Sequence, residues 1–288
     1  MLTRTIGDVA VSAIGLGGMP MSIEGRPDRE RSVATIHAAL DAGVTLIDTA
    51  DAYHQFADEV GHNESLIAEA LASYGGATDD VLVATKGGHL RPGDGSWTLD
   101  GSPQHLKEAC EASLKRLGVE AIGLYRFHRP DPKVDYADSV GAVRDLLDAG
   151  KIRMAGISNA NPDQIRLAAE ILGGRLVSVQ NQFSPAFRSS APELDLCDEL
   201  EIAFLPWSPL GGISKASGLG TTFKAFQDVA DGRGVSPQVV CLAWELAQAP
   251  VVIPIPGASR PETIRDSVTA ADLALTPEEL GALDAAVA

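Results

Sequence analysis

The chain has 288 residues, of which 45% are hydrophobic and 22% are charged, and its formal net charge at pH 7 is −16. This balance is that of a water-soluble protein with ample material for a core, and its apolar runs are far shorter than a membrane span. The excess of acidic residues argues against nucleic acid as a partner, because phosphates need a basic surface; any anionic ligand must find local basic contacts.

The amino-terminal segment LTRTIGDVAV (2–11) predicts a β-hairpin, since two short strand-like runs flank Gly7-Asp8. Apolar, β-branched runs then alternate with segments of helical periodicity along the chain. The strand-like runs cover 12–17, 45–50, 81–87, 122–127, 152–158, 176–181, 202–207 and 251–256. The helical segments cover 31–43, 65–74, 102–118, 136–150, 161–174, 191–201, 236–248 and 261–270.

Several of these helices carry start and stop signals: Ser102-Pro103 and Asn161-Pro162 open helices, and Gly118, Gly150 and Gly173 close them. Eight strand–helix pairs in strict order predict an α/β fold with a parallel sheet, and eight is the number that closes a (β/α)8 TIM barrel.

The last segment, 276–287, predicts an extra carboxy-terminal helix, because Thr276 and Glu279 have the spacing of a capping box. We expect residues 1–288 to form a single domain. A doubly wound open sheet is the alternative. It would usually place a G-x-G-x-x-G loop after the first strand, whereas this chain has GLGGMP at 15–20, which lacks that spacing.

Ionisable side chains stand where three consecutive predicted strands end. Asp48 ends the second strand and Tyr53 follows in the next loop; Lys86 ends the third strand and His128 the fourth. Each residue alone has a structural explanation, such as a capping carboxylate or a core histidine. Because the carboxyl ends of barrel strands share one face, their coincidence predicts a catalytic site there.

The four side chains suit proton delivery to an oxygen that gains negative charge. A lysine at a strand end needs a partner when buried, and Asp48 can supply it. Lys86 is expected to lower the pKa of Tyr53 from about 10, which would make the phenol a general acid near neutral pH. His128 can donate to, or orient, an oxygen held beside the phenol. A carbonyl that accepts hydride needs this chemistry.

The motifs IDTADAY, ATKGG, FHRPD, GISN, VQNQFSP, PWSPLGG and VIPIPGAS, in this order, resemble the aldo-keto reductase superfamily across nearly the whole chain. The resemblance implies a barrel that binds NADPH, with NADH the weaker alternative, and that reduces aldehydes or ketones to alcohols. It implies that Tyr53 is the proton donor, that Lys86 with Asp48 tunes it, and that His128 positions the substrate carbonyl. It implies no metal.

The resemblance also locates the cofactor. Ser158, Asn159 and Gln180 are expected to bind the nicotinamide amide, and Trp207 to stack on its ring. Ser259 and Glu262 have capping-box spacing at a helix start that can bind an anion, and Arg260 is the candidate for the 2′-phosphate. The predicted cofactor contacts are Gly18, Met19, Asp48, Ser158, Asn159, Gln180, Trp207, Ser208, Pro209, Leu210, Gly212, Gly257, Ser259, Arg260, Thr263, Asp266 and Ser267.

The chain departs from its relatives in places that affect specificity. Between Tyr53 and Asn63-Glu64 it has a longer loop, 54–62, which can add a wall to the substrate pocket. Asp266 and Ser267 stand where the resemblance implies the glutamate and asparagine of the adenosine site, and we expect no long carboxy-terminal tail to close the pocket. The predicted substrate-lining residues are Met19, Pro20, Tyr53, Trp97, Phe127, His128 and Trp207.

Two other functions fit parts of the sequence. A lysine at a barrel strand end also serves Schiff-base aldolases, although the cofactor motifs would then have no role. Some relatives act as NADP-bound regulatory subunits. The amino terminus lacks the pattern of a signal peptide, and Cys110, Cys197 and Cys241 have no metal-ligand spacing and cannot all pair. We therefore expect a cytoplasmic protein, monomeric or weakly oligomeric, whose partner is a small carbonyl compound rather than nucleic acid or membrane.

Overall fold

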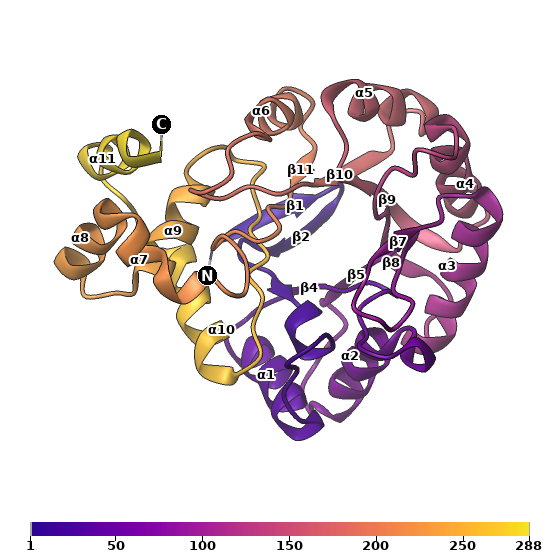
Figure 1. Cartoon of the computed structure of the whole chain (residues 1–288), viewed down its shortest axis with the longest axis horizontal. Helices are drawn as coiled ribbons and strands as arrows, with labels where there is room; N and C mark the ends of the chain where they lie inside the picture. Colours follow the sequence, from indigo (N-terminus) through magenta and orange to yellow (C-terminus); the bar gives the residue numbers. More distant parts are fainter. Residues whose placement is uncertain (1, 288) are drawn as a thin grey trace.

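The computed structural model describes residues 2–287 and has a curled parallel sheet at its centre, surrounded by helices (Figure 1). The sheet contains seven strands in the order β11-β10-β9-β8-β5-β4-β3, so neighbours in space follow the order of the chain. Seven of the eight predicted strands are thereby found. Their bounds are β3 Leu16–Gly17, β4 Leu46–Asp48, β5 Leu82–Gly87, β8 Ile122–Phe127, β9 Ile152–Ser158, β10 Leu176–Gln180 and β11 Ala203–Phe204.

The predicted eighth strand, 251–256, is not a regular strand. Pro254 and Pro256 have no amide hydrogen to donate to a ladder, although their carbonyls accept from Gly15 N and Gly17 N, each at 2.9 Å. On the other side of the segment, Ile253 N donates to Phe204 O at 2.9 Å. The segment therefore contacts both edges of the curled sheet, β3 and β11, through single bridges rather than a full ladder.

All eight predicted helices are present and cover the outside of the sheet. Their ends follow the local signals: Ser102 Oγ accepts from His105 N, and Asn161 forms a capping box with Gln164. Their bounds are α1 Arg29–Asp41, α2 His62–Ser73, α3 Pro103–Leu117, α4 Tyr136–Asp148, α5 Pro162–Ile171, α6 Ala191–Glu199, α9 Pro237–Leu246 and α10 Pro261–Val268.

Two further helices, α7 Leu219–Thr222 and α8 Lys224–Arg233, lie in a segment for which the sequence predicted none. The segment is short and polar, so its helicity depends on packing rather than on a long apolar stripe. Phe226 supplies that packing, with its ring centre 5.8 Å from that of Trp244 in α9. Short 3-10 turns occupy Met19–Met21, Ala57–Glu59, Ala216–Gly218 and Thr269–Asp272.

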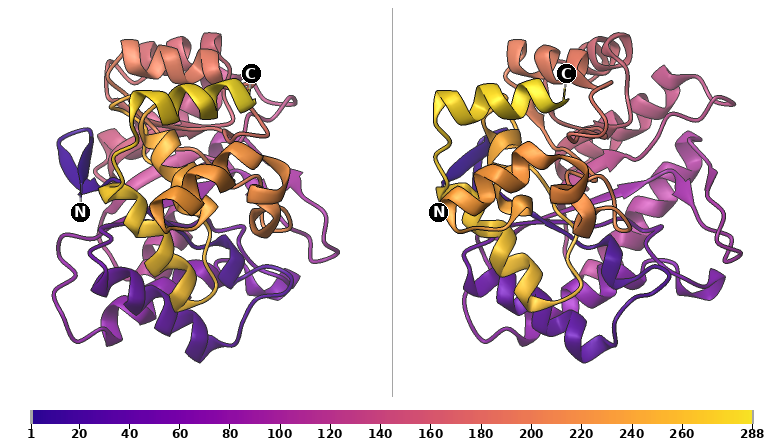
Figure 2. Two further views of the ribbon diagram at one scale, coloured as in Figure 1. Left: turned by 90° about the vertical axis from the view of Figure 1, so that its left-hand side faces the viewer. Right: turned by 60° about the vertical axis from the view of Figure 1, so that its left-hand side comes forward.

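The extra carboxy-terminal helix is α11, Pro277–Val287, which lies outside the ring beside α8 (Figure 2). Its predicted capping box is confirmed, since Thr276 N donates to the Glu279 carboxylate at 2.7 Å and Glu279 N donates to Thr276 Oγ1 at 3.2 Å. The Glu279 carboxylate also pairs with Arg233 of α8.

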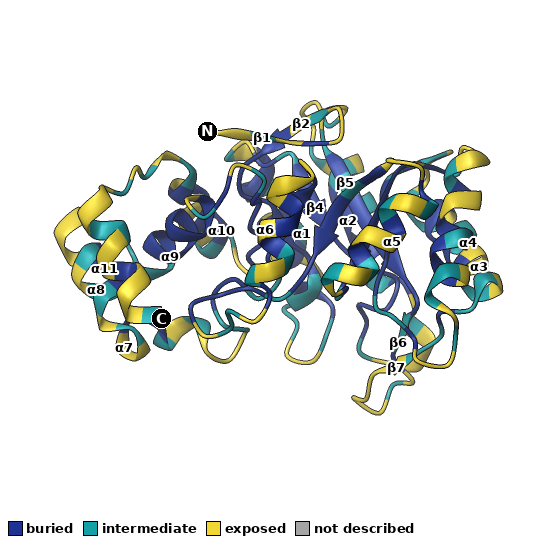
Figure 3. Ribbon diagram, turned by 90° about the horizontal axis from the view of Figure 1, so that it is seen from above, coloured by how far each residue is buried: buried dark blue, intermediate teal, exposed yellow. Residues whose placement is uncertain are grey.

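The predicted amino-terminal hairpin forms from β1 Thr3–Ile6 and β2 Val9–Ser12, and Gly7 takes a φ of 59° in its turn. Ile6 and Val11 pack against inward-facing apolar side chains of the sheet. The hairpin lies at the end of the sheet opposite a second, small hairpin of β6 His89–Leu90 and β7 Thr98–Leu99 (Figure 3). The hairpin β1–β2 thus closes the amino-terminal end and leaves the carboxyl end accessible.

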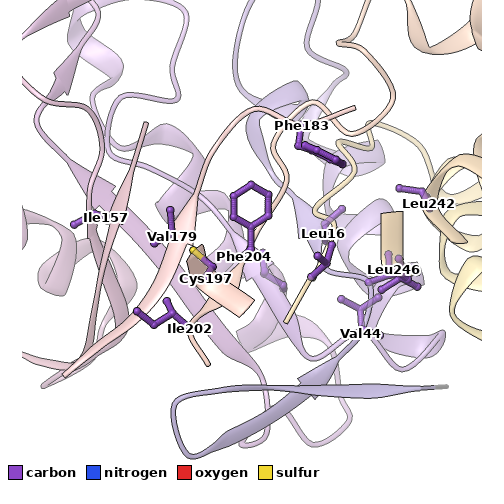
Figure 4. Close-up of a cluster of buried hydrophobic side chains, with 14 of the residues drawn as sticks. Leu16, Val44, Ile157, Val179, Phe183, Cys197, Ile202, Phe204, Leu242 and Leu246 are labelled. Carbon is purple, nitrogen blue, oxygen red and sulfur yellow. The ribbon is translucent and has the colours of Figure 1, made fainter. Parts of the chain in front are cut away.

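A second apolar layer joins the sheet to the helices (Figure 4). Leu16, Val179 and Phe204 come from strands, and Leu242 and Leu246 from α9. Close packing on the outer face of each strand fixes the direction in which its carboxyl end delivers side chains. No helix within residues 2–287 is long and apolar enough to cross a membrane.

Candidate active site

An open cavity of about 630 Å³ lies at the carboxyl ends of the strands. Its walls come from residues that end or follow successive strands, as expected for a barrel-type sheet. The lining residues are Gly17, Met19, Pro20, Ile23, Asp48, Tyr53, His89, Trp97, Leu99, His128, Arg129, Ser158, Asn159, Gln180, Trp207, Ser208, Pro209, Leu210, Gly212, Ile213, Ala216, Ile255, Pro256 and Gly257.

Three of the four predicted catalytic residues form one hydrogen-bonded group beneath this cavity. Lys86 Nζ donates to Asp48 Oδ2 at 2.7 Å, to the Thr49 carbonyl at 2.7 Å and to the Tyr53 hydroxyl at 3.1 Å. Lys86 is fully buried and Asp48 is nearly so. The ammonium therefore uses its three hydrogens on three acceptors, which fixes its position below the phenol.

Sequence reasoning missed a second buried cation at this site. Arg126 Nη1 donates to Asp48 Oδ1 at 2.7 Å, and Arg126 Nε donates to Ser178 Oγ at 3.0 Å. Gln180 Nε2 also donates to Asp48 Oδ1, at 2.8 Å. The alternation of side chains along β8 could have predicted this, because Arg126 and His128 are two residues apart and thus face the same side of the sheet.

The electrostatics of Tyr53 differ from the sequence-based expectation. Burial raises the pKa of the phenol well above 10, and the negative charge of Asp48 raises it further, with Arg126 opposing. The expected net lowering of this pKa is wrong, because burial of the phenol outweighs the lowering by the nearby cation Arg126. Lys86 itself has a pKa lowered to about 8, chiefly because burial disfavours its charge.

His128 lines the cavity beside Tyr53, with its ring edge-on to the phenol ring and the two ring centres 5.9 Å apart. Burial and the nearby charges lower the pKa of His128 well below 6.5, so its imidazole is neutral. Its Nδ1 is buried and has no partner within residues 2–287. A row of rings continues outward from His128 to His89 at 4.8 Å and from His89 to Trp97 at 4.6 Å.

The predicted nicotinamide-binding residues gather around Asn159, which follows β9 and has a φ of 57°. Asparagine tolerates this left-handed conformation better than most residues. Asn159 Nδ2 donates to the carbonyl of His128 and to Ser158 Oγ, each at 3.0 Å, and Asn159 Oδ1 accepts from Trp207 Nε1 at 3.2 Å. This network joins the ends of three strands into one side of the cavity.

The loop after Trp207 contributes backbone as well as side chains. Ser208 has a φ of 53°, and Gly211 and Gly212 have φ values of 83° and 104°. Ser208, Pro209, Leu210 and Gly212 line the cavity, as do Met19, Pro20 and Gly257. Gly18 lies behind this surface, where its amide donates to the Asp48 carbonyl at 2.8 Å.

The predicted substrate wall needs one correction. Phe127 is buried and does not line the cavity; its ring lies 6.0 Å from that of Tyr136. The alternation of β8 explains this, since Phe127 points to the side of the sheet opposite to Arg126 and His128. Trp97 does line the cavity, from the small hairpin β6–β7.

The small hairpin is held against two neighbouring segments by Arg91, whose side chain is 2% exposed. Its guanidinium donates to the His54 carbonyl and to the Glu24 carboxylate, and it stacks 4.5 Å from the centre of the Trp97 ring. His54 begins the longer loop 54–62. That loop thus supports the wall that carries Trp97.

A second group of buried acids lies behind Lys86. Glu64 accepts hydrogen bonds from Thr85 Oγ1 and from Arg116 Nε. Asp51 is close enough to Glu64 for repulsion, and burial together with this repulsion raises the pKa of Asp51 to about 8. Its Oδ1 has no partner within the described chain.

The predicted phosphate site lies at the start of α10, outside the cavity lining. The Ser259–Glu262 capping box is wrong, because Arg260 takes the N-cap position and no side chain caps the helix. Arg260 is exposed and its Nε donates to Thr263 Oγ1 at 2.9 Å. Asp266 accepts from Ser236 Oγ at 2.6 Å, and the buried Ser267 donates to the Thr263 carbonyl at 3.0 Å.

Metal ligation has no support among residues 2–287, which contain no cluster of three or more His, Cys, Asp or Glu side chains suited to an ion. Cys110, Cys197 and Cys241 are free and buried.

Comparison with known proteins identifies relatives along the whole chain. The sequence model of the Aldo/keto reductase family matches residues 13–288. An uncharacterized oxidoreductase from Schizosaccharomyces pombe is 35% identical over 288 residues, which cover 98% of this chain and 89% of the relative. A 6-dehydroglucose reductase from Novosphingobium aromaticivorans is 34% identical over 271 residues, which cover 91% and 87% of the two chains.

Solved structures agree with this assignment. A thermostable aldo-keto reductase in complex with the inhibitor epalrestat matches with a TM-score of 0.83 at 26% identity, over 99% of this chain and 100% of that one. An aldo/keto reductase from Klebsiella pneumoniae in complex with NADP and acetate matches with a TM-score of 0.80 at 26% identity, over 98% of this chain and 94% of that one. The chain therefore belongs to the aldo/keto reductase family, whose members are oxidoreductases that use nicotinamide cofactors.

Proposed function

We propose that this protein reduces aldehydes or ketones to alcohols with NADPH, and that residues 1–288 form one domain for this purpose. The observation that carries the proposal is the contact between Lys86 Nζ and the Tyr53 hydroxyl at 3.1 Å, on the floor of the cavity. A phenol at this position can donate its proton to an oxygen that enters the cavity.

The lining fits a nicotinamide nucleotide. The half-exposed indole of Trp207 offers a flat face, and Ser158, Asn159 and Gln180 place amide and hydroxyl groups beside it. The turn at Ser208, with glycines after it, brings backbone close to the cavity. When bound there, the reduced nicotinamide supplies a hydride.

The remaining steps belong to the protein's own side chains. Tyr53 holds the proton that the carbonyl oxygen takes up as it gains negative charge. Because its pKa is high, the phenol stays protonated at neutral pH and serves as an acid without loss to solvent. Lys86 and Arg126 provide positive charge below that oxygen, with Asp48 fixing both cations. The neutral His128, whose ring lies edge-on to that of Tyr53, orients the carbonyl.

For the phosphates we propose the start of α10. The positive end of a helix dipole favours an anion, and Arg260 is exposed there. Arg260 accounts for the expected preference for NADPH, because the planar guanidinium can donate two parallel hydrogen bonds to two oxygens of one phosphate group. Gly257, Ser259, Thr263, Asp266 and Ser267 complete the proposed adenosine side.

The test is the loss of NADPH absorbance with a reactive neutral aldehyde such as 4-nitrobenzaldehyde. The wild-type protein is expected to turn over, and Tyr53→Phe to lose about 10²–10⁴-fold in kcat while it keeps its affinity for NADPH. Because Tyr53→Phe keeps the aromatic ring, the packing around residue 53 should be the same in both proteins. A wild-type rate in this variant would show that another group donates the proton. Borohydride trapping of a lysine adduct would favour the Schiff-base alternative instead.

A further inference from the structure

The cavity holds a cation that the proposed reduction does not use. Arg129 follows His128 in the chain, is half-buried and lines the cavity. Its Nη2 donates to Asn159 Oδ1 at 3.1 Å, whereas its Nε is buried without a partner within residues 2–287. The hydrogen bond to Asn159 orients the guanidinium, and donors remain for a ligand.

The charge of Arg129 is not cancelled by its surroundings. Burial lowers the pKa of Arg129, and no acidic side chain within residues 2–287 forms an ion pair with it. Asp48, the acid among the described lining residues, is already held between Lys86 and Arg126. His89 and His128 have lowered pKa values and are neutral. The cavity is therefore positive, although the whole chain carries a net charge of −16.

A positive cavity in an acidic protein favours an anionic substrate through local contacts. A guanidinium pairs with a carboxylate through two parallel N–H···O bonds, and it does so best where little water competes. Arg129 is adjacent to His128, which we place beside the reacting carbonyl. Trp97, His89 and Leu99 supply apolar and aromatic surface for the rest of the molecule.

We propose that the substrates of this protein are oxo acids, carbonyl compounds that also carry a carboxylate, and that Arg129 is the residue that binds this carboxylate. The inference rests on the proposed reductase function and adds the substrate class. Arg129 does not take part in the hydride or proton transfer. It acts as a specificity residue, through the position and affinity of the substrate.

The experiment compares 4-carboxybenzaldehyde with its neutral isostere 4-formylbenzamide, and the corresponding 3-substituted pair, in wild type, Arg129→Met and Arg129→Lys. The measured quantity is the ratio of kcat/KM for the acid to kcat/KM for the amide, which removes effects common to both substrates. Arg166→Met is the matched control, because it removes the same formal charge from an exposed position on α5. NADPH affinity is measured for every variant by fluorescence titration.

In Arg129→Met the ratio is expected to fall by about tenfold to a hundredfold for at least one of the two pairs, the range for a hydrogen bond to a charged group. The acid-to-amide ratio should fall less in Arg129→Lys and should be unchanged in Arg166→Met. Added salt should lower the ratio in the wild type. If Arg129→Met fails to fold, the Arg129→Lys ratio decides the question.

Two results would overturn the inference. The first is an acid-to-amide ratio that is unchanged in both Arg129 variants, which includes an equal loss with the acid and the amide. The second is a loss explained by weaker NADPH binding, which would make Arg129 a cofactor contact. The proposed function fails differently, since wild type would then reduce neither the acid nor the amide.

Discussion

Arg126 and Lys86 bind opposite oxygens of the same carboxylate, Asp48, each at 2.7 Å and with both cations fully buried. The group carries two positive charges and one negative charge, so Asp48 is the residue on which the burial of both cations depends. A buried cation without its partner carries a large desolvation cost.

This arrangement predicts unequal effects of two substitutions. Asp48→Asn leaves two buried cations without an anion and is expected to lower the free energy of unfolding by about 3–5 kcal/mol. Lys86→Met leaves Asp48 with Arg126 and Gln180, so its stability loss should be smaller, although its reductase rate should fall steeply. Urea unfolding of both variants at pH 7 measures the difference. Equal destabilisation would show that Arg126 does not hold Asp48 in solution.

A second prediction concerns the wall beside the cavity. Arg91→Met removes a nearly buried guanidinium that joins Glu24, the His54 carbonyl and the Trp97 ring. We expect a stability loss of about 1.5–3 kcal/mol, faster proteolysis within 54–62 and 89–99, and a higher KM for aromatic aldehydes. Lys107→Met, which removes an exposed ion pair on α3, is the control. Unchanged proteolysis and KM would mean that Arg91 is not needed to hold the two segments together.

The sequence predicted most of the framework because local signals and packing agree there. Seven strands and all eight helices follow from apolar periodicity and from caps such as Ser102 and Asn161. The eighth segment, 251–256, was predicted as a strand but does not form a regular one. Its prolines remove hydrogen-bond donors, which weakens the ladder without removing the segment from the sheet edge. Helices α7 and α8 were not predicted because their helicity depends on tertiary packing, such as the contact of Phe226 in α8 with Trp244 in α9.

The candidate site was also predicted only in part from the sequence. Residues at strand ends, such as Asp48 and Lys86, could be found because the carboxyl ends of parallel strands meet. Arg126 was missed because a charge within an apolar run gives no sign of its partner, Asp48, two strands away in the sheet. The pKa of Tyr53 was misjudged because burial, its largest cause, depends on tertiary packing.

A third prediction tests the phosphate site at the start of α10. Arg260→Ala removes an exposed guanidinium without removing a helix cap, since no side chain caps this helix. NADPH affinity should fall by roughly 1.5–3 kcal/mol, and NADH affinity should change little. Lys224→Ala, at an exposed position of α8, controls for net charge. Equal weakening of both cofactors in a fluorescence titration would remove Arg260 from the 2′-phosphate site.

The last prediction concerns Asp51, whose carboxyl is buried near Glu64 and has a pKa of about 8 instead of 3.8. Between these two values the folded protein binds a proton that the unfolded chain has released. The stability that this proton provides is complete below pH 4 and is lost as the pH rises towards 8.

Asp51→Asn is close in shape to the protonated acid and cannot ionise, so it should remove this part of the pH dependence. We expect wild type to lose more stability than Asp51→Asn between pH 5 and pH 8, on the order of 1.4 kcal/mol for each pH unit. Urea unfolding at both pH values measures this difference, and all other titratable groups are common to both proteins. Parallel pH curves for the two proteins would mean that Asp51 is ionised in the folded state. Arg116 would then be its counter-ion, because it is the first of the nearby cations to lower the pKa of Asp51.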